Sequence, residues 1–222
     1  MTQALKANLS SDAEKLLLVE GVDDWHILGH ITAGLRQTGT AFEIGYCNND
    51  SDLMDMLGSA LVVSNSTKRF LGAVLDSDAD TGVGRRLEDI RSRLEAAYDF
   101  PTDFPADGLI LMPKASRTDH ARLPKIGVWL MPDNQQDGIF EDLLCAAMSS
   151  ASLQYISAAV DQAKQDKFAT FRGVERSKAI VKTHIAWQDP NKKNLGEAIN
   201  SHFENLDPAC APFLSWLQAL FG

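Results

Sequence analysis

Two short apolar runs that each end in a carboxylate constrain the fold of this chain more than any other feature. The first is Lys15-Leu-Leu-Leu-Val followed by Glu20, and the second is Phe70-Leu-Gly-Ala-Val-Leu followed by Asp76. A short apolar run bounded by polar, turn-forming residues is typical of a buried β-strand. In an open α/β sheet, acids at the carboxyl ends of such strands face the crevice where ligands bind. The sequence therefore predicts an α/β sheet with an acidic site at one edge.

Further segments extend this pattern into alternating strands and helices. Strands are expected at 15–20, 42–47, 70–76, 108–112 and 127–131, with helices at 24–37, 51–63 and 84–98. Such alternation predicts βαβ crossovers and a mostly parallel sheet flanked by helices. After residue 139 the pattern becomes helical, with helices expected at 139–149, 152–171, 174–186, 195–203 and 211–220. We expect an α/β domain at 1–149 and a helical C-terminal extension at 150–222, packed on it by Trp187, Phe203, Phe213, Trp216 and Phe221.

The acids after the second strand alternate as Asp76, Asp78 and Asp80. Carboxylates packed this closely repel one another and raise each other's pKa unless a cation joins them. Hard oxygen ligands of this kind suit Mg²⁺ or Mn²⁺. An EF-hand is excluded because Thr81 and Leu87 stand where glycine and an acid are needed. A sugar-nucleotide site of the Asp-x-Asp type and a plain acidic surface turn remain open.

The first strand leads into a second acidic element. Glu20 ends an apolar strand and needs a partner. Gly21 can permit a sharp turn into the next helix. Asp24 lies four residues after Glu20, so it is either a metal ligand or a helix cap, whereas Asp23 fits a cap better.

Composition favours a cytoplasmic globular protein. The chain has 222 residues, enough for one core with a helical appendage. It shows neither a charged-then-apolar leader nor an apolar run long enough to cross a membrane. Its three cysteines, Cys47, Cys145 and Cys210, are scattered, which predicts buried thiols rather than disulfides or a zinc site.

The net charge of −9 argues against nucleic-acid binding, but positive charge is concentrated locally. Residues 164–193 contain eight basic and three acidic residues. A second basic segment contains Lys114, Arg117 and Arg122. Each segment is either a solvated face or, beside a metal site, a set of phosphate contacts.

The two acidic elements together resemble the Toprim signature. Leu17-Leu-Val-Glu20-Gly21 matches its glutamate after the first strand, and Val74-Leu-Asp76-Ser-Asp78 matches its Asp-x-Asp. The resemblance covers roughly residues 15–145 and implies a small, mostly parallel sheet whose acids hold Mg²⁺ for phosphoryl chemistry on nucleic acid. The segments around Lys182 and Trp216 resemble small stand-alone Toprim-related bacterial proteins of poorly defined function.

Nucleases of the OLD (overcoming lysogenization defect) type share this domain and imply further site residues. Their additional acid corresponds best to Glu141, with Asp133 and then Asp142 as competitors. Their C-terminal lysine corresponds best to Lys182, although Lys178 lies one helical turn earlier on the same face. Such a lysine would neutralise charge that develops on the scissile phosphate.

The resemblance therefore implies metal-dependent cleavage of nucleic acid, with DNA favoured over RNA. Glu20, Asp76 and Asp78 would hold one Mg²⁺ or Mn²⁺, and Asp80 and Glu141 would serve a second. A topoisomerase or primase would need domains that this short chain lacks. An ATPase partner in trans is a further hypothesis, because OLD-type nucleases carry an ATPase and this sequence has no Walker motif. Analogy with these nucleases also suggests a role in defence against foreign DNA. The alternatives are a non-catalytic module that binds nucleic acid or a partner, and a phosphotransferase acting on a nucleotide.

Overall fold

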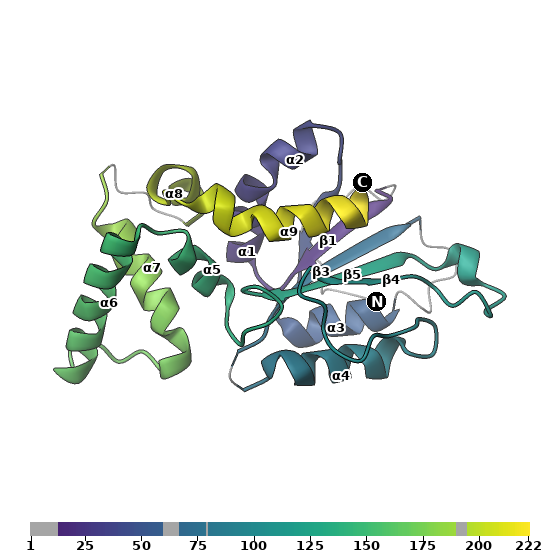
Figure 1. Ribbon diagram of the computed structural model, residues 1–222, viewed down its shortest axis with the longest axis horizontal. Coiled ribbons are helices and arrows are strands. Elements are labelled where there is room, and N and C mark those ends of the chain that lie inside the picture. Colours follow the sequence, from purple (N-terminus) through teal and green to yellow (C-terminus); the bar gives the residue numbers. More distant parts are fainter. Residues whose placement is uncertain (1–12, 60–66, 79, 190–194) are drawn as a thin grey trace.

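A mostly parallel β-sheet forms the centre of the structure (Figure 1). The computed structural model describes residues 13–59, 67–78, 80–189 and 195–222. The strands of these residues are β1 (Lys15–Val19), β2 (Glu43–Tyr46), β3 (Phe70–Asp76), β4 (Leu109–Leu111) and β5 (Lys125–Met131), in the order β2-β1-β3-β5-β4. Neighbouring strands are parallel except β4, which runs antiparallel to β5. The expected α/β class is confirmed.

The strand order creates a crevice between β1 and β3. From β1 the chain passes outward to β2, and it then returns past β1 to form β3. The chain that leaves β3 forms β4 at the opposite edge of the sheet and then returns to form β5 beside β3. Neighbouring strands whose connections depart in opposite directions mark the topological switch point, where open sheets bind ligands. Glu20 follows β1 and Asp76 ends β3 at this point.

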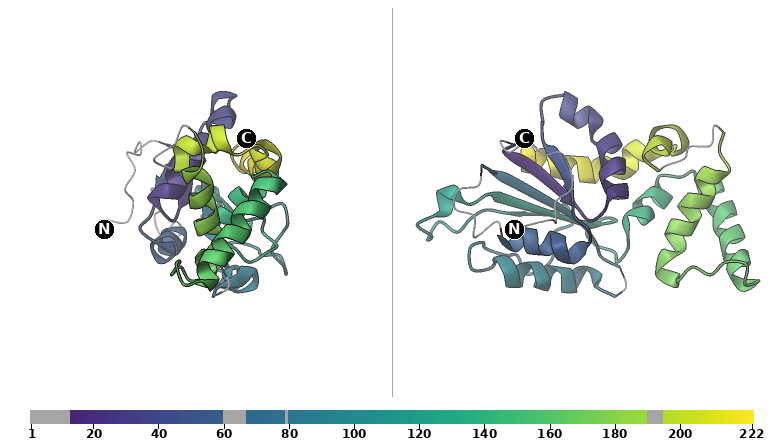
Figure 2. Two further views of the ribbon diagram at one scale, coloured as in Figure 1. Left: turned by 90° about the vertical axis from the view of Figure 1, so that its left-hand side faces the viewer. Right: turned by 180° about the vertical axis from the view of Figure 1, so that it is seen from behind.

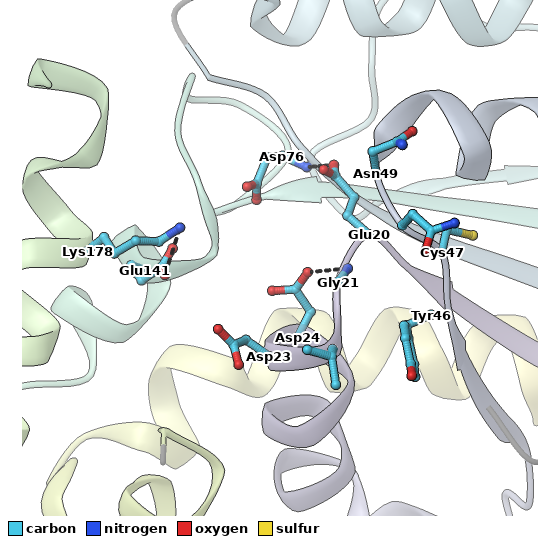
Figure 3. A pocket seen from close by; sticks show the side chains of 12 residues that line it. Glu20, Gly21, Asp23, Asp24, Tyr46, Cys47, Asn49, Asp76, Glu141 and Lys178 are labelled. Atoms are coloured by element: carbon cyan, nitrogen blue, oxygen red, sulfur yellow. Dashed lines mark hydrogen bonds and ion pairs between the residues drawn. The ribbon is translucent and has the colours of Figure 1, made fainter. Parts of the chain in front are cut away.

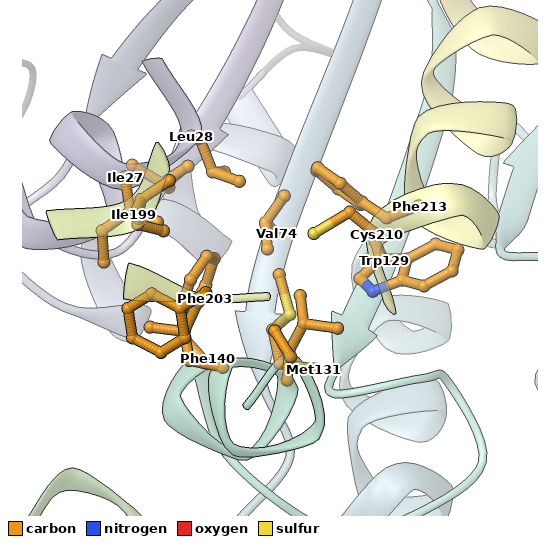
Figure 4. Packing of buried hydrophobic residues seen from close by; sticks show 14 of the residues in the cluster. Ile27, Leu28, Val74, Trp129, Met131, Phe140, Ile199, Phe203, Cys210 and Phe213 are labelled. Atoms are coloured by element: carbon orange, nitrogen blue, oxygen red, sulfur yellow. The ribbon is translucent and has the colours of Figure 1, made fainter. Parts of the chain in front are cut away.

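Both faces of the sheet are covered by helices. In β1, Leu17 and Val19 face one hydrophobic cluster, whereas Leu16 and Leu18 face the other, as the two-residue period of a strand requires. The first cluster contains side chains of α1, α8 and α9, and the second contains side chains of α3 and α4 (Figures 1 and 4). These helices are α1 (Val22–Ile31), α3 (Asp50–Ser59), α4 (Gly82–Leu94), α8 (Leu195–His202) and α9 (Leu206–Phe221).

Helix α9 lies directly against the central strands. A Cβ atom added to Gly127 of β5 would lie 2.5 Å from Leu220 Cδ2, so any other residue would force α9 side chains to move. The helix begins at Leu206, five residues before the expected start at 211, and it continues through Pro212. Its additional first turns carry Cys210 into the core beside Trp129 (Figure 4). This burial outweighs the backbone hydrogen bond that proline cannot donate.

Two helices form an arm beyond the carboxyl ends of the strands. They are α6 (Ser150–Gln165) and α7 (Arg176–Ala186), and they lie side by side in every view, linked to the sheet domain by α5 (Phe140–Ala146) (Figures 1 and 2). Trp187 follows α7 and is 54% exposed, so the expectation that it packs in the core is wrong. It contacts Tyr155 of α6 instead, with ring centroids 6.1 Å apart.

Other element boundaries differ from the sequence prediction for local reasons. The helix expected at 24–37 is two helices, α1 and α2 (Ala33–Gln37), which meet at Thr32. Helix α6 ends before 171 because Lys167 takes a left-handed conformation with φ 62°. Short 3-10 turns occur at η1 (His120–Arg122) and η2 (Gly173–Glu175). Part of the helix expected at 51–63 lies outside the described residues, and the division at 149 stays a prediction.

No helix in the described part of the chain is long and apolar enough to cross a membrane. The three cysteines are free and buried, as the sequence predicted.

Candidate functional site

Carboxylates from four segments line one pocket at the switch point (Figure 3). The pocket has a volume of about 630 Å³ and opens at the carboxyl ends of β1 and β3, facing the arm. Its charged lining residues are Glu20, Asp23, Asp24, Asp76, Glu141 and Lys178. Among the residues that the structure describes, five carboxylates thus face a single lysine, and the pocket is strongly acidic.

Glu20 links the two central strands at the pocket. Its Oε1 accepts a hydrogen bond from the backbone N–H of Asp76 at 2.9 Å. This bond joins the residue after β1 to the last residue of β3, across the crevice between them. The partner that Glu20 was expected to need is therefore a backbone amide.

Asp24 is both a helix cap and a pocket residue. It occupies the third position of α1, and its Oδ2 accepts a hydrogen bond from Gly21 N at 3.0 Å. Gly21 has φ −134° and ψ 171°, an extended conformation open to any residue. The turn from β1 into α1 therefore does not depend on the conformational freedom of glycine. The neighbouring Asp23 is exposed at the rim of the pocket.

Asp76 and Glu141 bring β3 and α5 together. Asp76 Oδ1 accepts a hydrogen bond from Phe140 N, the first residue of α5, at 3.0 Å. The next residue, Glu141, turns its side chain into the pocket, where its Oε1 lies 3.5 Å from Lys178 Nζ of α7 (Figure 3). Residues far apart in the sequence thus form one wall of the pocket.

Burial makes these carboxyl groups difficult to ionise. Burial and then the nearby charges, Glu20 first, raise the pKa of Asp76 from 3.8 to about 8. Burial also raises the pKa of Glu20 from 4.5 to about 7, although the Asp76 N–H opposes the rise. The pKa of Asp24 rises from 3.8 to about 6 for the same main reason. A cation that entered the pocket would favour the ionised carboxylates and offset the repulsion between them.

The donor chemistry fits a hard divalent cation. Glu20, Asp24 and Asp76 each give one oxygen to a backbone N–H, and among the described residues the second oxygen of each accepts no hydrogen bond. Oxygen donors of this type are the ligands that Mg²⁺ and Mn²⁺ prefer. In the same part of the chain, no three acidic, histidine or cysteine side chains surround a common point closely enough to hold an ion as they stand. Coordination would therefore require side-chain rotation, which the free oxygens permit.

The other acids after β3 lie outside the pocket lining. Asp78 Oδ1 accepts hydrogen bonds from the backbone N–H groups of Asp80 and Thr81, both at 3.2 Å, and from the Thr81 hydroxyl at 3.0 Å. Asp80 is exposed. Asp78 thus shapes the loop that leads into α4, and the structure does not bring Asp80 to the other acids.

Among the competing candidates, the structure brings Glu141 and Lys178 into the pocket. Lys182 is exposed on α7 and does not line the pocket. Asp133 caps its own turn by accepting from Gln135 N and Gln136 N. Asp142 accepts from Ile139 N and from the Ser177 hydroxyl. Asp133 therefore holds its own turn, whereas Asp142 caps α5 and links it to α7.

The basic residues 114–122 lie at the other end of the sheet (Figure 1). Because β4 is antiparallel to β5, the loop between them precedes the amino end of β5, about 20 Å along the strands from the pocket. Lys114 lies 3.9 Å from Asp99, and Arg117 forms an ion pair with Asp119 at 2.7 Å. Arg122 belongs to η1 in the same loop. These three residues cannot contact a phosphate held at the pocket.

A family sequence profile matches residues 14–222, which is almost the whole chain. The chain belongs to the DUF3226 family. DUF3226 is described as a protein of unknown function. No curated protein and no solved structure matches this sequence. The DUF3226 region includes the pocket, the sheet and the arm, so all candidate site residues lie inside it.

Sequence reasoning missed one charged residue that supports the pocket of this DUF3226 chain. Arg86 of α4 is only 5% exposed, and its Nε donates to the backbone oxygen of Asp76 at 2.8 Å. Its Nη1 lies 3.1 Å from Asp50 Oδ2 at the start of α3. Its position four residues before Ile90, on the buried stripe of an amphipathic helix, was the signal that could have revealed it.

Proposed function

We propose that this protein hydrolyses phosphodiester bonds of nucleic acid with the help of Mg²⁺ or Mn²⁺. The observation that carries the proposal is the convergence of carboxylates from β1, α1, β3 and α5 in one pocket at the switch point of the sheet. Desolvated acids without a matching set of cations are costly to maintain for stability alone. The cost is understandable if they serve a bound ion.

Glu20, Asp24 and Asp76 would hold the ion, with Glu141 in the same pocket. A bound divalent ion would polarise the phosphate and lower the pKa of a bound water. The backbone hydrogen bonds to Glu20 and Asp76 hold each carboxyl group at the pocket while leaving its second oxygen free. Rotation of the side chains would bring these free oxygens onto a bound ion.

Lys178 supplies the positive charge that a phosphodiester needs. Its side chain is 46% exposed and already lies at the pocket, beside Glu141. An ammonium group in this position can approach the scissile phosphate and stabilise the charge that develops there. We therefore propose Lys178, rather than Lys182, as the catalytic lysine.

The resemblance to Toprim nucleases supports the same reaction. Glu20 and Asp76, the first acid of each motif, line the pocket, whereas Asp78 lies in the adjoining loop. We propose DNA as the preferred substrate and a cytoplasmic location. Asp78 would act by holding the loop.

A second candidate is a module that works through a partner protein, such as an ATPase in trans. The arm favours it, because three aromatic side chains are exposed there: Tyr155 at 72%, Phe168 at 86% and Trp187 at 54%. In that case the isolated chain would bind its partner but show no cleavage.

The test is cleavage of supercoiled plasmid and of single-stranded RNA with Mg²⁺, Mn²⁺ or EDTA. Glu20→Gln and Asp76→Asn should each reduce metal-dependent cleavage at least about a hundredfold, beyond the loss usual for an outer-shell partner. Asp107→Asn is the matched control, because it removes the same charge at an exposed position outside the pocket. Cleavage that survives both pocket substitutions would refute the assignment. Inactivity of every variant would favour the partner-dependent module.

A further inference from the structure

The pocket extends well beyond its carboxylates. An ion with six waters, at about 30 Å³ per water, fills roughly 200 Å³. This is about a third of the 630 Å³ pocket. The remaining lining includes Val22, Tyr46, Asn48 and Asn49, none of which carries a charge. Figure 3 shows Tyr46 and Asn49 on the side of the pocket away from Glu141 and Lys178, and this side, the uncharged end, presents an aromatic ring and an amide.

Tyr46 provides a fixed flat surface at the uncharged end. It is the last residue of β2 and is half-buried. The ring of Trp25 supports it, with centroids 6.0 Å apart, and Trp25 is itself held by a hydrogen bond from Nε1 to the Ile44 oxygen at 2.8 Å. Figure 3 shows Tyr46 on the far side of Gly21 and Asp24 from Asp76. The ring is therefore positioned by packing and does not depend on a ligand.

The two asparagines are oriented by the start of α3. Asn48 Nδ2 donates to Asp52 Oδ2 at 2.8 Å, which leaves its amide oxygen as an acceptor. Asn49 Oδ1 accepts from Asp52 N at 2.8 Å, which leaves its amide nitrogen as a donor. The two amides therefore offer one acceptor and one donor in the same pocket as the ring, with Asn49 beside Glu20 and Tyr46 on the other side of Cys47 (Figure 3). These are the groups that recognise a nucleobase, which stacks on aromatic side chains and bonds through its edge.

We propose that this end of the pocket binds an unpaired nucleobase whose phosphate lies at the carboxylate end. The inference rests on the proposed function, because Lys178 is the only cation among the described lining residues and cannot offset five acids. The phosphate would therefore enter only with a divalent ion. A base paired in a duplex is stacked and cannot reach Tyr46, so the substrate is a single strand, a frayed end or a free nucleotide.

The test measures binding of a labelled ten-nucleotide phosphorothioate DNA strand in Mg²⁺ by fluorescence anisotropy. Tyr46→Leu should weaken binding by about fivefold to a hundredfold, the effect of losing one base-aromatic stack. Tyr46→Phe keeps the ring and should bind within about twofold of wild type. Tyr155→Leu is the matched control on the arm, because Tyr155 is exposed and outside the pocket. Thermal melting of each variant verifies folding and reports the stabilisation by Mg²⁺.

The outcomes separate this inference from the proposed function. The inference would be overturned if wild type and Tyr46→Leu bound the strand equally, or if the strand and a blunt duplex of the same sequence bound equally. If Mg²⁺ still raised the melting temperature normally in that case, the proposed metal site would stand. If Mg²⁺ did not raise the melting temperature of the wild type and the wild type did not bind the strand, both the base subsite and the proposed function would be overturned. If a nucleoside monophosphate displaced the labelled strand, a free nucleotide would be identified as the source of the base. If the strand bound and the monophosphate did not displace it, nucleic acid would be identified as the source. Either result supports the subsite.

Discussion

In the metal-free protein, we expect the substitution Asp76→Asn to stabilise the fold, and increasingly so as the pH rises. The folded-state pKa of Asp76 is raised from 3.8 to about 8, so between these values the unfolded chain loses a proton that the folded chain retains. Stability from this group is therefore complete below about pH 4 and is lost as the pH rises toward 8. Asparagine stays neutral at every pH, and its amide oxygen can still accept from Phe140 N.

The magnitude follows from the same pKa change. At 1.36 kcal/mol per pH unit, the rise from 3.8 to about 8 corresponds to about 6 kcal/mol. Solvent in the open pocket and movement of neighbouring carboxyl groups relieve part of this cost. We therefore expect Asp76→Asn to raise the free energy of unfolding by roughly 2–3 kcal/mol at pH 8.5 and by much less at pH 5.

Urea denaturation in EDTA at pH 5, 7 and 8.5 measures this difference, with Asp107→Asn as the charge-matched control. Mg²⁺ at a hundred times its Kd should restore about 2.7 kcal/mol to the wild type at pH 8.5 and much less to Asp76→Asn. Parallel pH profiles for wild type and Asp76→Asn would refute the reasoning. Such a result would mean that Asp76 is not desolvated in the folded protein.

Two further predictions concern the catalytic lysine and the packing of α9. Lys178→Met should reduce the rate of cleavage about a hundredfold, because the phosphate would lose its cationic contact. Lys182→Met, outside the pocket on the same helix, should change the rate little. Steady-state kinetics compare the two variants, and equal losses would contradict the choice of Lys178. Gly127→Ala should lower the free energy of unfolding by about 1–3 kcal/mol, since its Cβ would lie 2.5 Å from Leu220 Cδ2. Urea denaturation measures it, with Gly84→Ala as the control because a Cβ there meets no atom within 4 Å.

Much of the sheet could be predicted because its signals are local. The apolar runs that form β1, β3 and β5 are short and bounded by polar residues, and each became a buried strand. The alternation of Leu16 to Val19 between two cores follows from the two-residue period of a strand. The position of Glu20 and Asp76 at one edge of the sheet could be predicted for the same reason, since the end of a strand fixes which edge an acid occupies.

Other parts of the site could not be predicted, because local sequence does not determine which way a loop directs its side chains. Asp78 continues an alternating run of acids, yet it turns back to accept hydrogen bonds from its own loop. Tyr46 reads as an ordinary strand residue, and only its position beside Trp25 at the pocket distinguishes it. Trp187 was expected in the core but lies exposed on the arm, where its ring contacts that of Tyr155 at an angle of 60°.

The sequence by itself determined that apolar strands end in carboxylates and that helices separate them. Tertiary structure alone decided which acids meet. It placed Glu141 and Lys178 opposite Asp76, although more than sixty residues separate each from it in the sequence. It also placed the basic loop at the far end of the sheet, because β4 pairs antiparallel to β5. The physical reason is that strand order and direction are set by the burial of both sheet faces under helices, a property of the whole chain that no single segment encodes.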